Sequence, residues 1–73
     1  MTAKPHRIML SCFTNPHGAF VYQAHFDGMP VQRETPSYPI AASLAESMRE
    51  DYPGAVCSTW NGDTATEIIV TAF

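Results

Sequence analysis

Basic residues are scarce in this chain, and the few that occur are scattered. The 73 residues include four Lys and Arg against seven Asp and Glu, and the formal net charge is −3 at pH 7. A protein that binds nucleic acid directly needs clustered Lys and Arg to neutralise phosphates. Because Lys4, Arg7, Arg33 and Arg49 lie far apart in the sequence, we expect no direct contact with nucleic acid.

Long apolar runs and a disulfide framework are also missing. No stretch approaches the ~20 apolar residues that a membrane-spanning helix needs, and residues 1–7 lack the apolar segment of a secretory signal. We therefore expect a cytoplasmic protein without a membrane partner. Cys12 and Cys57 are the only cysteines, and each lies in a strand-like run. We expect reduced thiols packed in the core, and the sequence leaves open whether the two lie close together.

Motifs for catalysis and metal binding are absent from the sequence. The three histidines, His6, His17 and His25, have no Cys-x-x-Cys beside them, so we predict neither a metal site nor a cofactor. Ser, His and Asp occur without the surrounding sequence that positions them for nucleophilic catalysis. We expect a protein that is not an enzyme and has no catalytic residue.

The first third of the chain alternates with the period of a β-strand. Arg7–Thr14 and Ala19–Phe26 each place successive side chains on opposite faces. In the second run, the face that carries Phe20, Tyr22, Ala24 and Phe26 is the better candidate for the core. Asn15-Pro16-His17-Gly18 fits a type I turn between the two strands.

A hairpin signal and a proline define the next element. Asp27-Gly28 is a strong two-residue hairpin sequence, and Met29–Glu34 is predicted as the third strand. Pro30 cannot donate a ladder hydrogen bond, so this strand belongs at an edge of the sheet.

Pro39–Tyr52 has the pattern of an amphipathic helix. Pro39 suits the first helical turn, with Ser37 or Tyr38 as the N-cap, and Pro53-Gly54 ends the segment. The apolar stripe expected to cover the sheet comprises Ile40, Leu44 and Met48, with Ala41, Ala45 and Tyr52 beside them.

Two further strands follow the helix. Ala55–Trp60 and Thr64–Phe73 are strand-like, and Asn61-Gly62 predicts a turn between them. Which side chains of these two strands face the core is ambiguous from the sequence. The whole pattern predicts a single α+β domain, residues 1–73, with an antiparallel sheet of four to five strands in the order β-β-β-α-β-β and one helix packed on one face.

A single helix leaves the other face of the predicted sheet open. By the alternation above, this face carries Met9, Phe13, Val21 and His25. An exposed apolar patch on a small domain commonly marks a surface for a partner or a second copy. This prediction depends on the assignment of faces in the first two strands.

The acidic residues and the lone tryptophan are the candidate protein-binding residues. Glu46, Glu50 and Asp51 cluster on the outer side and end of the predicted helix, and Asp63 lies in a predicted turn. A solvated face is the ordinary role of such residues, and a surface that attracts a basic partner is the alternative. Trp60 is either a sheet-packing residue or an interface anchor, since tryptophan is enriched at binding hot spots.

The small size, acidic charge and element order make the chain similar to the small anti-CRISPR proteins of bacteriophages. No sequence motif contributes to this resemblance. It implies a stoichiometric inhibitor in the host cytoplasm that binds a Cas protein or surveillance complex and blocks nucleic-acid binding or cleavage. Carboxylates on such a protein can occupy the place of phosphates in a basic channel, and Glu46, Glu50, Asp51 and Asp63 are the candidates for that role.

Two alternatives stay open. The element order also resembles the antitoxins of HicB-type pairs, in which a β-meander followed by a helix and a strand covers a small toxin. This chain lacks the DNA-binding segment that many of those antitoxins append. The other alternative is a homodimeric accessory protein whose open sheet face pairs with itself.

Overall fold

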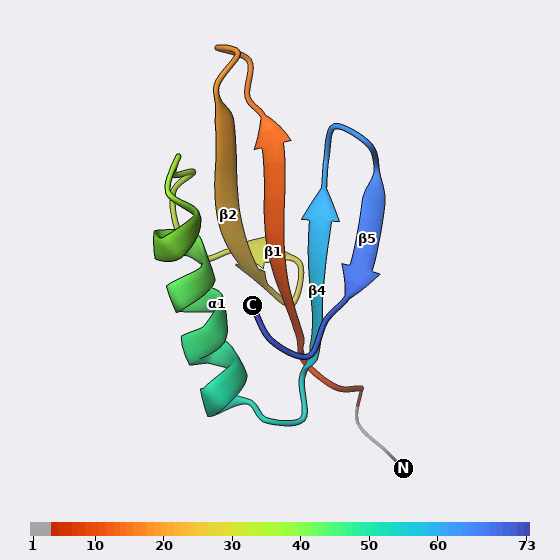
Figure 1. Ribbon diagram of the computed structural model, residues 1–73. Helices are drawn as coiled ribbons and strands as arrows, with labels where there is room; N and C mark the ends of the chain where they lie inside the picture. Colours follow the sequence, from red (N-terminus) through yellow and green to blue (C-terminus); the bar gives the residue numbers. More distant parts are fainter. Residues whose placement is uncertain (1–3) are drawn as a thin grey trace.

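The computed structural model of the protein describes residues 4–73, which form five strands and one helix (Figure 1). In chain order these are β1 (Arg7–Thr14), β2 (Phe20–Phe26), β3 (Met29–Pro30), α1 (Tyr38–Asp51), β4 (Val56–Asn61) and β5 (Thr66–Ile69). The predicted α+β class and the element order β-β-β-α-β-β are confirmed.

The strands form one mixed sheet in the order β3-β2-β1-β4-β5. The prediction of an antiparallel sheet is wrong at one place, because β1 pairs parallel with β4 and antiparallel with β2. The helix explains this difference. It carries the chain back along the sheet, so β4 begins beside the start of β1, where Arg7 lies opposite Val56. A helical crossover of this kind joins parallel strands, whereas a hairpin joins antiparallel ones.

The turns follow from local sequence. Asp27 and Gly28 have φ values of 50° and 84°, the left-handed backbone that a two-residue hairpin requires. The amide of Gly18 donates to the carbonyl of Asn15 at 2.9 Å, which confirms the predicted turn between β1 and β2. The last turn is longer than the Asn61-Gly62 signal predicts, because residues 62–65 separate β4 from β5 and Ala65 has a φ of 52°.

Helix α1 lies within one residue of its predicted bounds. Ser37 is the N-cap, and its side-chain oxygen accepts a hydrogen bond from the amide of Ile40 at 3.3 Å. Pro39 lies in the first turn, where a missing amide hydrogen costs nothing. Tyr52 caps the C-terminal end and donates its amide to Met48.

Small side chains on α1 form its contact with β1 and β2. Ala41, Ala42 and Ala45 are buried and pack against a core that contains Ile8, Leu10, Ala24 and Cys57. Leu44 and Met48 pack at the margin of this core, as predicted, but Ile40 is 58% exposed and does not face the sheet. The error has a geometric cause: the stripe that includes Ala41 and Ala45 brings the helix closer to the strands than one centred on Ile40.

Two predicted strands are shorter in the structure. Beyond Pro30 the chain leaves the β3 ladder, because the Gln32 side chain, rather than backbone, accepts the hydrogen bond of the Ala24 amide at 2.8 Å. Strand β3 still lies at the sheet edge, as its proline indicates. Strand β5 ends at Ile69, and the segment after it turns toward the helix (Figure 1), where Val70 and Phe73 pack against the core.

Candidate functional site

The helix-free face of the sheet, called the open face below, carries the residues that alternation assigns to it. Met9 pairs with His25, and Phe13 pairs with Val21 across β1 and β2. The predicted placement of these four residues is therefore confirmed. Val21 is only 5% exposed, so it supports this face from below and adds little accessible surface.

Trp60 joins this face from β4. Its register partner on β1 is Ser11, which places the indole on the same side of the sheet as Met9 and Phe13. The sequence did not show which side chains of β4 face the helix, because the register of β4 on β1 is set by the helical crossover. The structure settles it: Cys57 faces the helix and Trp60 the open face.

These side chains surround a hollow of about 190 Å³, the open-face hollow. It is lined by Met9, Ser11, Phe13, Gln23, His25, Trp60 and Gly62. Its floor is fixed, because Ser11 is 2% exposed and donates its hydroxyl hydrogen to the carbonyl of Gln23 at 2.9 Å. Small-molecule sites are usually larger, ~300 Å³ and above. The size and the aromatic walls suit one apolar side chain of a protein partner.

The same hollow does not hold a nucleophile paired with a base. The Ser11 hydroxyl is bonded to the backbone carbonyl of Gln23, and Nδ1 of the His25 ring lies 3.3 Å from the same carbonyl. Nucleophilic catalysis needs a hydroxyl or thiol within hydrogen-bond reach of the base. Ser11 and His25 are therefore not arranged as a nucleophile and its base in this structure.

Glu46 is occupied by contacts within the chain. Its carboxylate accepts hydrogen bonds from the Arg49 guanidinium, one of them 2.8 Å from Nε, and from the backbone amide of Phe73 at 3.2 Å. The Arg49 hydrogen bond, followed by that of Phe73, lowers the pKa of Glu46 from its ordinary value. Glu46 therefore ties the end of the chain to the helix.

Asp63 is likewise engaged. Its carboxylate accepts hydrogen bonds from Thr14, at 2.7 Å from Oγ1 and 3.0 Å from the backbone amide. The Thr14 side-chain hydrogen bond, with the backbone one, lowers the pKa of Asp63. Asp63 therefore holds the β4–β5 turn against the end of β1.

The five predicted binding residues do not form one surface. Glu50 and Asp51 are exposed at the C-terminal end of α1, close to where β4 begins, whereas Asp63 follows the end of β4. The six residues of β4 span roughly 20 Å at ~3.3 Å per residue. Trp60 lies on the open face, apart from the helix end. Of the acidic residues, Glu50 and Asp51 have the freest carboxylates.

Three residues of the hollow were missed from the sequence. Ser11 and Gln23 share the alternation of Met9 and His25, so the strand pattern could have identified them. Gly62 was interpreted only as a turn residue, yet a Cβ at this position would lie 3.1 Å from Phe13 Cβ and 3.5 Å from Trp60 Nε1. Only the parallel pairing of β1 with β4 brings Gly62 beneath these rings.

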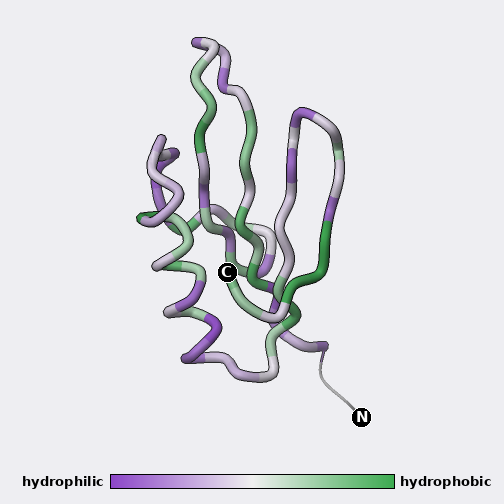
Figure 2. The backbone as a smooth tube through the Cα atoms, viewed as in Figure 1, coloured by the Kyte–Doolittle hydropathy of each residue, from purple (hydrophilic) through white to green (hydrophobic). Residues whose placement is uncertain are grey.

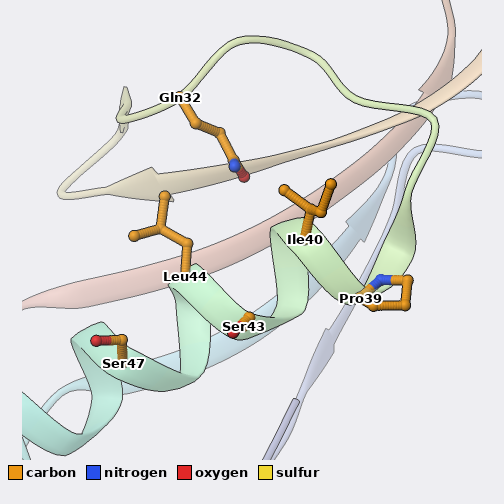
Figure 3. Close-up of a pocket in the computed structure, with 6 residues that line it drawn as sticks. All are labelled: Gln32, Pro39, Ile40, Ser43, Leu44 and Ser47. Atoms are coloured by element: carbon orange, nitrogen blue, oxygen red, sulfur yellow. The ribbon is translucent and has the colours of Figure 1, made fainter.

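A second groove runs beside the helix. It has a volume of about 580 Å³ and is lined by Gln32, Pro39, Ile40, Ser43, Leu44 and Ser47. Figure 3 shows Ile40 and Leu44 pointing from α1 toward the loop that carries Gln32. It lacks aromatic walls, and the Gln32 amide oxygen is already bonded to the sheet. The open-face hollow is therefore the stronger candidate.

The two cysteines lie too far apart to form a disulfide, and the His6 ring is held by neighbouring side chains. Cys57 pairs with Ile8, and Cys12 lies four register positions further along β1, roughly 13 Å away at ~3.3 Å per residue, beyond disulfide reach. His6 Nδ1 lies 2.8 Å from the Asp27 carboxylate, and the His6 ring packs against Phe26 and Tyr52 with centroid separations of 5.0 Å.

Residues 4–73 contain no group of three or more His, Cys, Asp and Glu side chains placed to hold a metal ion, and none of their helices is long and apolar enough to cross a membrane. Comparisons with protein-family models, curated protein sequences and solved structures find no significant match.

Proposed function

We propose that the protein acts by binding another protein through its open face, with Trp60 and Phe13 as anchors. The observation that carries this proposal is the open-face hollow, whose aromatic walls surround a floor held by Ser11. Binding hot spots concentrate in aromatic residues around well-packed pockets. The hollow has room for one side chain, so the partner contributes an apolar side chain to its centre.

The proposed partner is a Cas protein or surveillance complex, which the protein inhibits by occupying a nucleic-acid site. The length of 73 residues, the net charge of −3 and the β-β-β-α-β-β order support this version. The exposed carboxylates of Glu50 and Asp51 supply charge that steers the protein toward a basic channel. In this arrangement the open face provides affinity and the helix end provides orientation.

Plasmid interference in bacteria with an active CRISPR system tests the proposal. Co-expression of the protein is expected to restore transformation by a targeted plasmid. Trp60→Ala should weaken binding to the purified effector about 30-fold, the equivalent of ~2 kcal/mol for a hot-spot residue. Tyr38→Ala is the matched control, because Tyr38 is an exposed aromatic residue at the start of α1 and not on the open face.

The outcomes separate the two parts of the proposal. Loss of inhibition with the charge-reversed pair Glu50→Lys and Asp51→Lys, but not with Trp60→Ala, would move the binding surface to the helix end. Full interference in the presence of the protein, for every CRISPR type tested, would remove Cas proteins as the target. Trp60 is the only tryptophan, so a shift of its emission on mixing reports contact at the open face directly.

A second candidate is an antitoxin similar to those of HicB-type pairs. The specific observation in its favour is the order β1-β2-β3, a meander, followed by α1 and β4. Such a protein would neutralise a small basic toxin by direct contact. Co-expression with a small basic protein encoded beside its gene tests this function: restored growth supports it, and unrelieved toxicity rejects it.

A further inference from the structure

The two edges of the sheet are protected to different degrees. Beyond β2, the chain from Met29 onward covers the outer edge: the amide of Val31 donates to Ala24, and Thr35 exchanges two backbone hydrogen bonds with Tyr22 at 2.8 and 3.0 Å. Between these contacts the Gln32 side chain bonds the Ala24 amide. The covering segment contains Pro30 and an irregular stretch, so it is a poor template for another strand.

The other edge, β5, has no such cover among residues 4–73. All four residues of β5 are exposed, and two of them are adjacent isoleucines, Ile68 at 58% and Ile69 at 63% exposure. Figure 2 shows the end of this strand and the start of the segment after it among the most hydrophobic parts of the backbone. An exposed apolar edge strand is a site at which another strand can pair.

Hydrogen-bond alternation identifies the residues available at this edge. The amide of Val70 donates to the carbonyl of Cys57 on β4. In an antiparallel ladder, residues two apart turn their backbone groups the same way. Ile68 therefore directs its backbone toward β4, and Glu67 and Ile69 direct theirs to the free edge.

We propose that β5 pairs antiparallel with β5 of a second copy of this chain, with the two-fold axis at Ile68. The two Ile68 side chains then meet on the helix side of the extended sheet. Glu67 lies opposite Ile69 of the second copy, and the outward backbone groups of these residues pair. The two five-stranded sheets become one continuous sheet.

Charge and strand length select this register. An axis at Glu67 would oppose two carboxylates, which is unfavourable across a strand pair. An axis at Ile69 would need residues beyond β5, where the chain has turned toward the helix. The Arg7 guanidinium lies 3.6 Å from the Glu67 carboxylate, which partly neutralises the edge. The covered edge beside β2 limits the assembly to two copies.

The thin core gives the second copy a stabilising role. Among the described residues, Ile8 is the largest side chain that is fully buried. The buried residues of α1 are all alanines. Small domains bury a low fraction of their surface and often gain stability by association. Pairing at β5 buries Ile68 on the helix side of the sheet and Ile69 on the open-face side, and none of the residues that line the open-face hollow lies on β5.

Sedimentation velocity of the purified protein tests this proposal independently of any partner. A dimer is expected to form within the range of about 1 μM to 1 mM. Ile68→Lys should return the sedimentation coefficient to that of a monomer, with an unchanged far-UV spectrum. Met29→Lys is the matched control, because Met29 is 68% exposed on the opposite edge strand, and it should leave the dimer intact.

A cysteine at the axis gives a second, positive readout. Facing residues at a non-hydrogen-bonded position lie ~4.5 Å apart between Cα atoms, within the range of a disulfide. Ile68→Cys should form a covalent dimer with copper phenanthroline as oxidant, whereas the parent chain and Glu67→Cys should not. A monomer at all concentrations overturns the proposal. So does a dimer that Trp60→Ala dissociates and Ile68→Lys preserves, since that contact lies on the open face.

Discussion

Thr14 and Asp63, 49 positions apart in the sequence, are joined by two hydrogen bonds to one carboxylate. This contact joins the end of β1, directly after Phe13, to the β4–β5 turn, directly after the strand that carries Trp60. It therefore connects the stability of the turn with the geometry of the open face.

A double-mutant cycle measures this connection. Asp63→Ala and Thr14→Val should each lower the melting temperature, and the double variant should lose less than the sum, because either change removes the side-chain hydrogen bond. Asp51→Ala, an exposed acidic residue at the helix end, is the control and should change little. Simple additivity of the two changes would show that the side chains do not interact.

Three carboxylates should make the fold sensitive to acid. The backbone hydrogen bond from Arg7, then that of His6, lowers the pKa of Asp27, and the contacts described above lower the pKa of Glu46 and Asp63. Each folded-state pKa lies below the unfolded value, which is ~3.9 for Asp and ~4.3 for Glu. Their stabilisation is therefore present above the unfolded pKa and is lost as pH falls through the folded pKa.

The measurement is the melting temperature between pH 7 and pH 2, followed by circular dichroism. It should stay level near neutral pH and fall below about pH 4. The combined Asp27→Asn, Glu46→Gln and Asp63→Asn variant should have a lower melting temperature at pH 7. Its melting temperature should also fall less steeply on acidification than that of the wild type. A wild-type melting temperature that rises on acidification would contradict the shifts.

Local sequence predicted the parts of this fold that depend on neighbouring residues. Asp27-Gly28 identified a hairpin because both residues tolerate positive φ, and alternation assigned Met9, Phe13 and His25 to the open face. The parallel pairing of β1 with β4 and the bond between Glu46 and Phe73, 27 positions apart, depend on where the helix returns the chain. No local pattern encodes that choice, so the predicted sheet was antiparallel and the acidic residues were grouped together.

The close approach of α1 to the sheet depends on its alanines. Ala45 has no exposed surface in the structure, so a larger side chain must push the helix away from β1 and β2. Ala45→Leu should reduce the free energy of unfolding by ~1–3 kcal/mol, the usual cost of overpacking a core. Ser47→Leu places the same side chain on the exposed side of α1 and should stay within about 0.5 kcal/mol of wild type. Urea denaturation of both variants provides the comparison.

The N-terminal end of α1 depends on one hydroxyl. Ser37 accepts the Ile40 amide, and its own amide donates to the Thr35 side chain at 3.1 Å. Ser37→Ala should lower the free energy of unfolding by ~1 kcal/mol, since the Ile40 amide loses its cap. Ser43→Ala, an exposed change within the helix, should be neutral or slightly stabilising because alanine favours helix. Equal losses in the two variants would show that the cap contributes nothing.

Gly62 should control the geometry of the open-face hollow. Its amide donates to the carbonyl of Cys12 at 2.8 Å, which holds the backbone close under Phe13 and Trp60. An added Cβ 3.1 Å from Phe13 Cβ forces one of the two to shift. Gly62→Ala should therefore change the emission of Trp60 and weaken partner binding more than it lowers the melting temperature.

Gly54→Ala is the matched control for this change, because nothing lies within 4 Å of a Cβ at Gly54. It should leave the Trp60 emission unchanged. If Gly62→Ala also leaves the emission unchanged, the backbone around position 62 accommodates the added methyl group without displacing Trp60. The shape of the hollow then does not depend on this glycine. If both the emission and the binding respond, the glycine is needed for the shape of the hollow as well as for the turn, because a Cβ at this position would lie 3.1 Å from Phe13 Cβ.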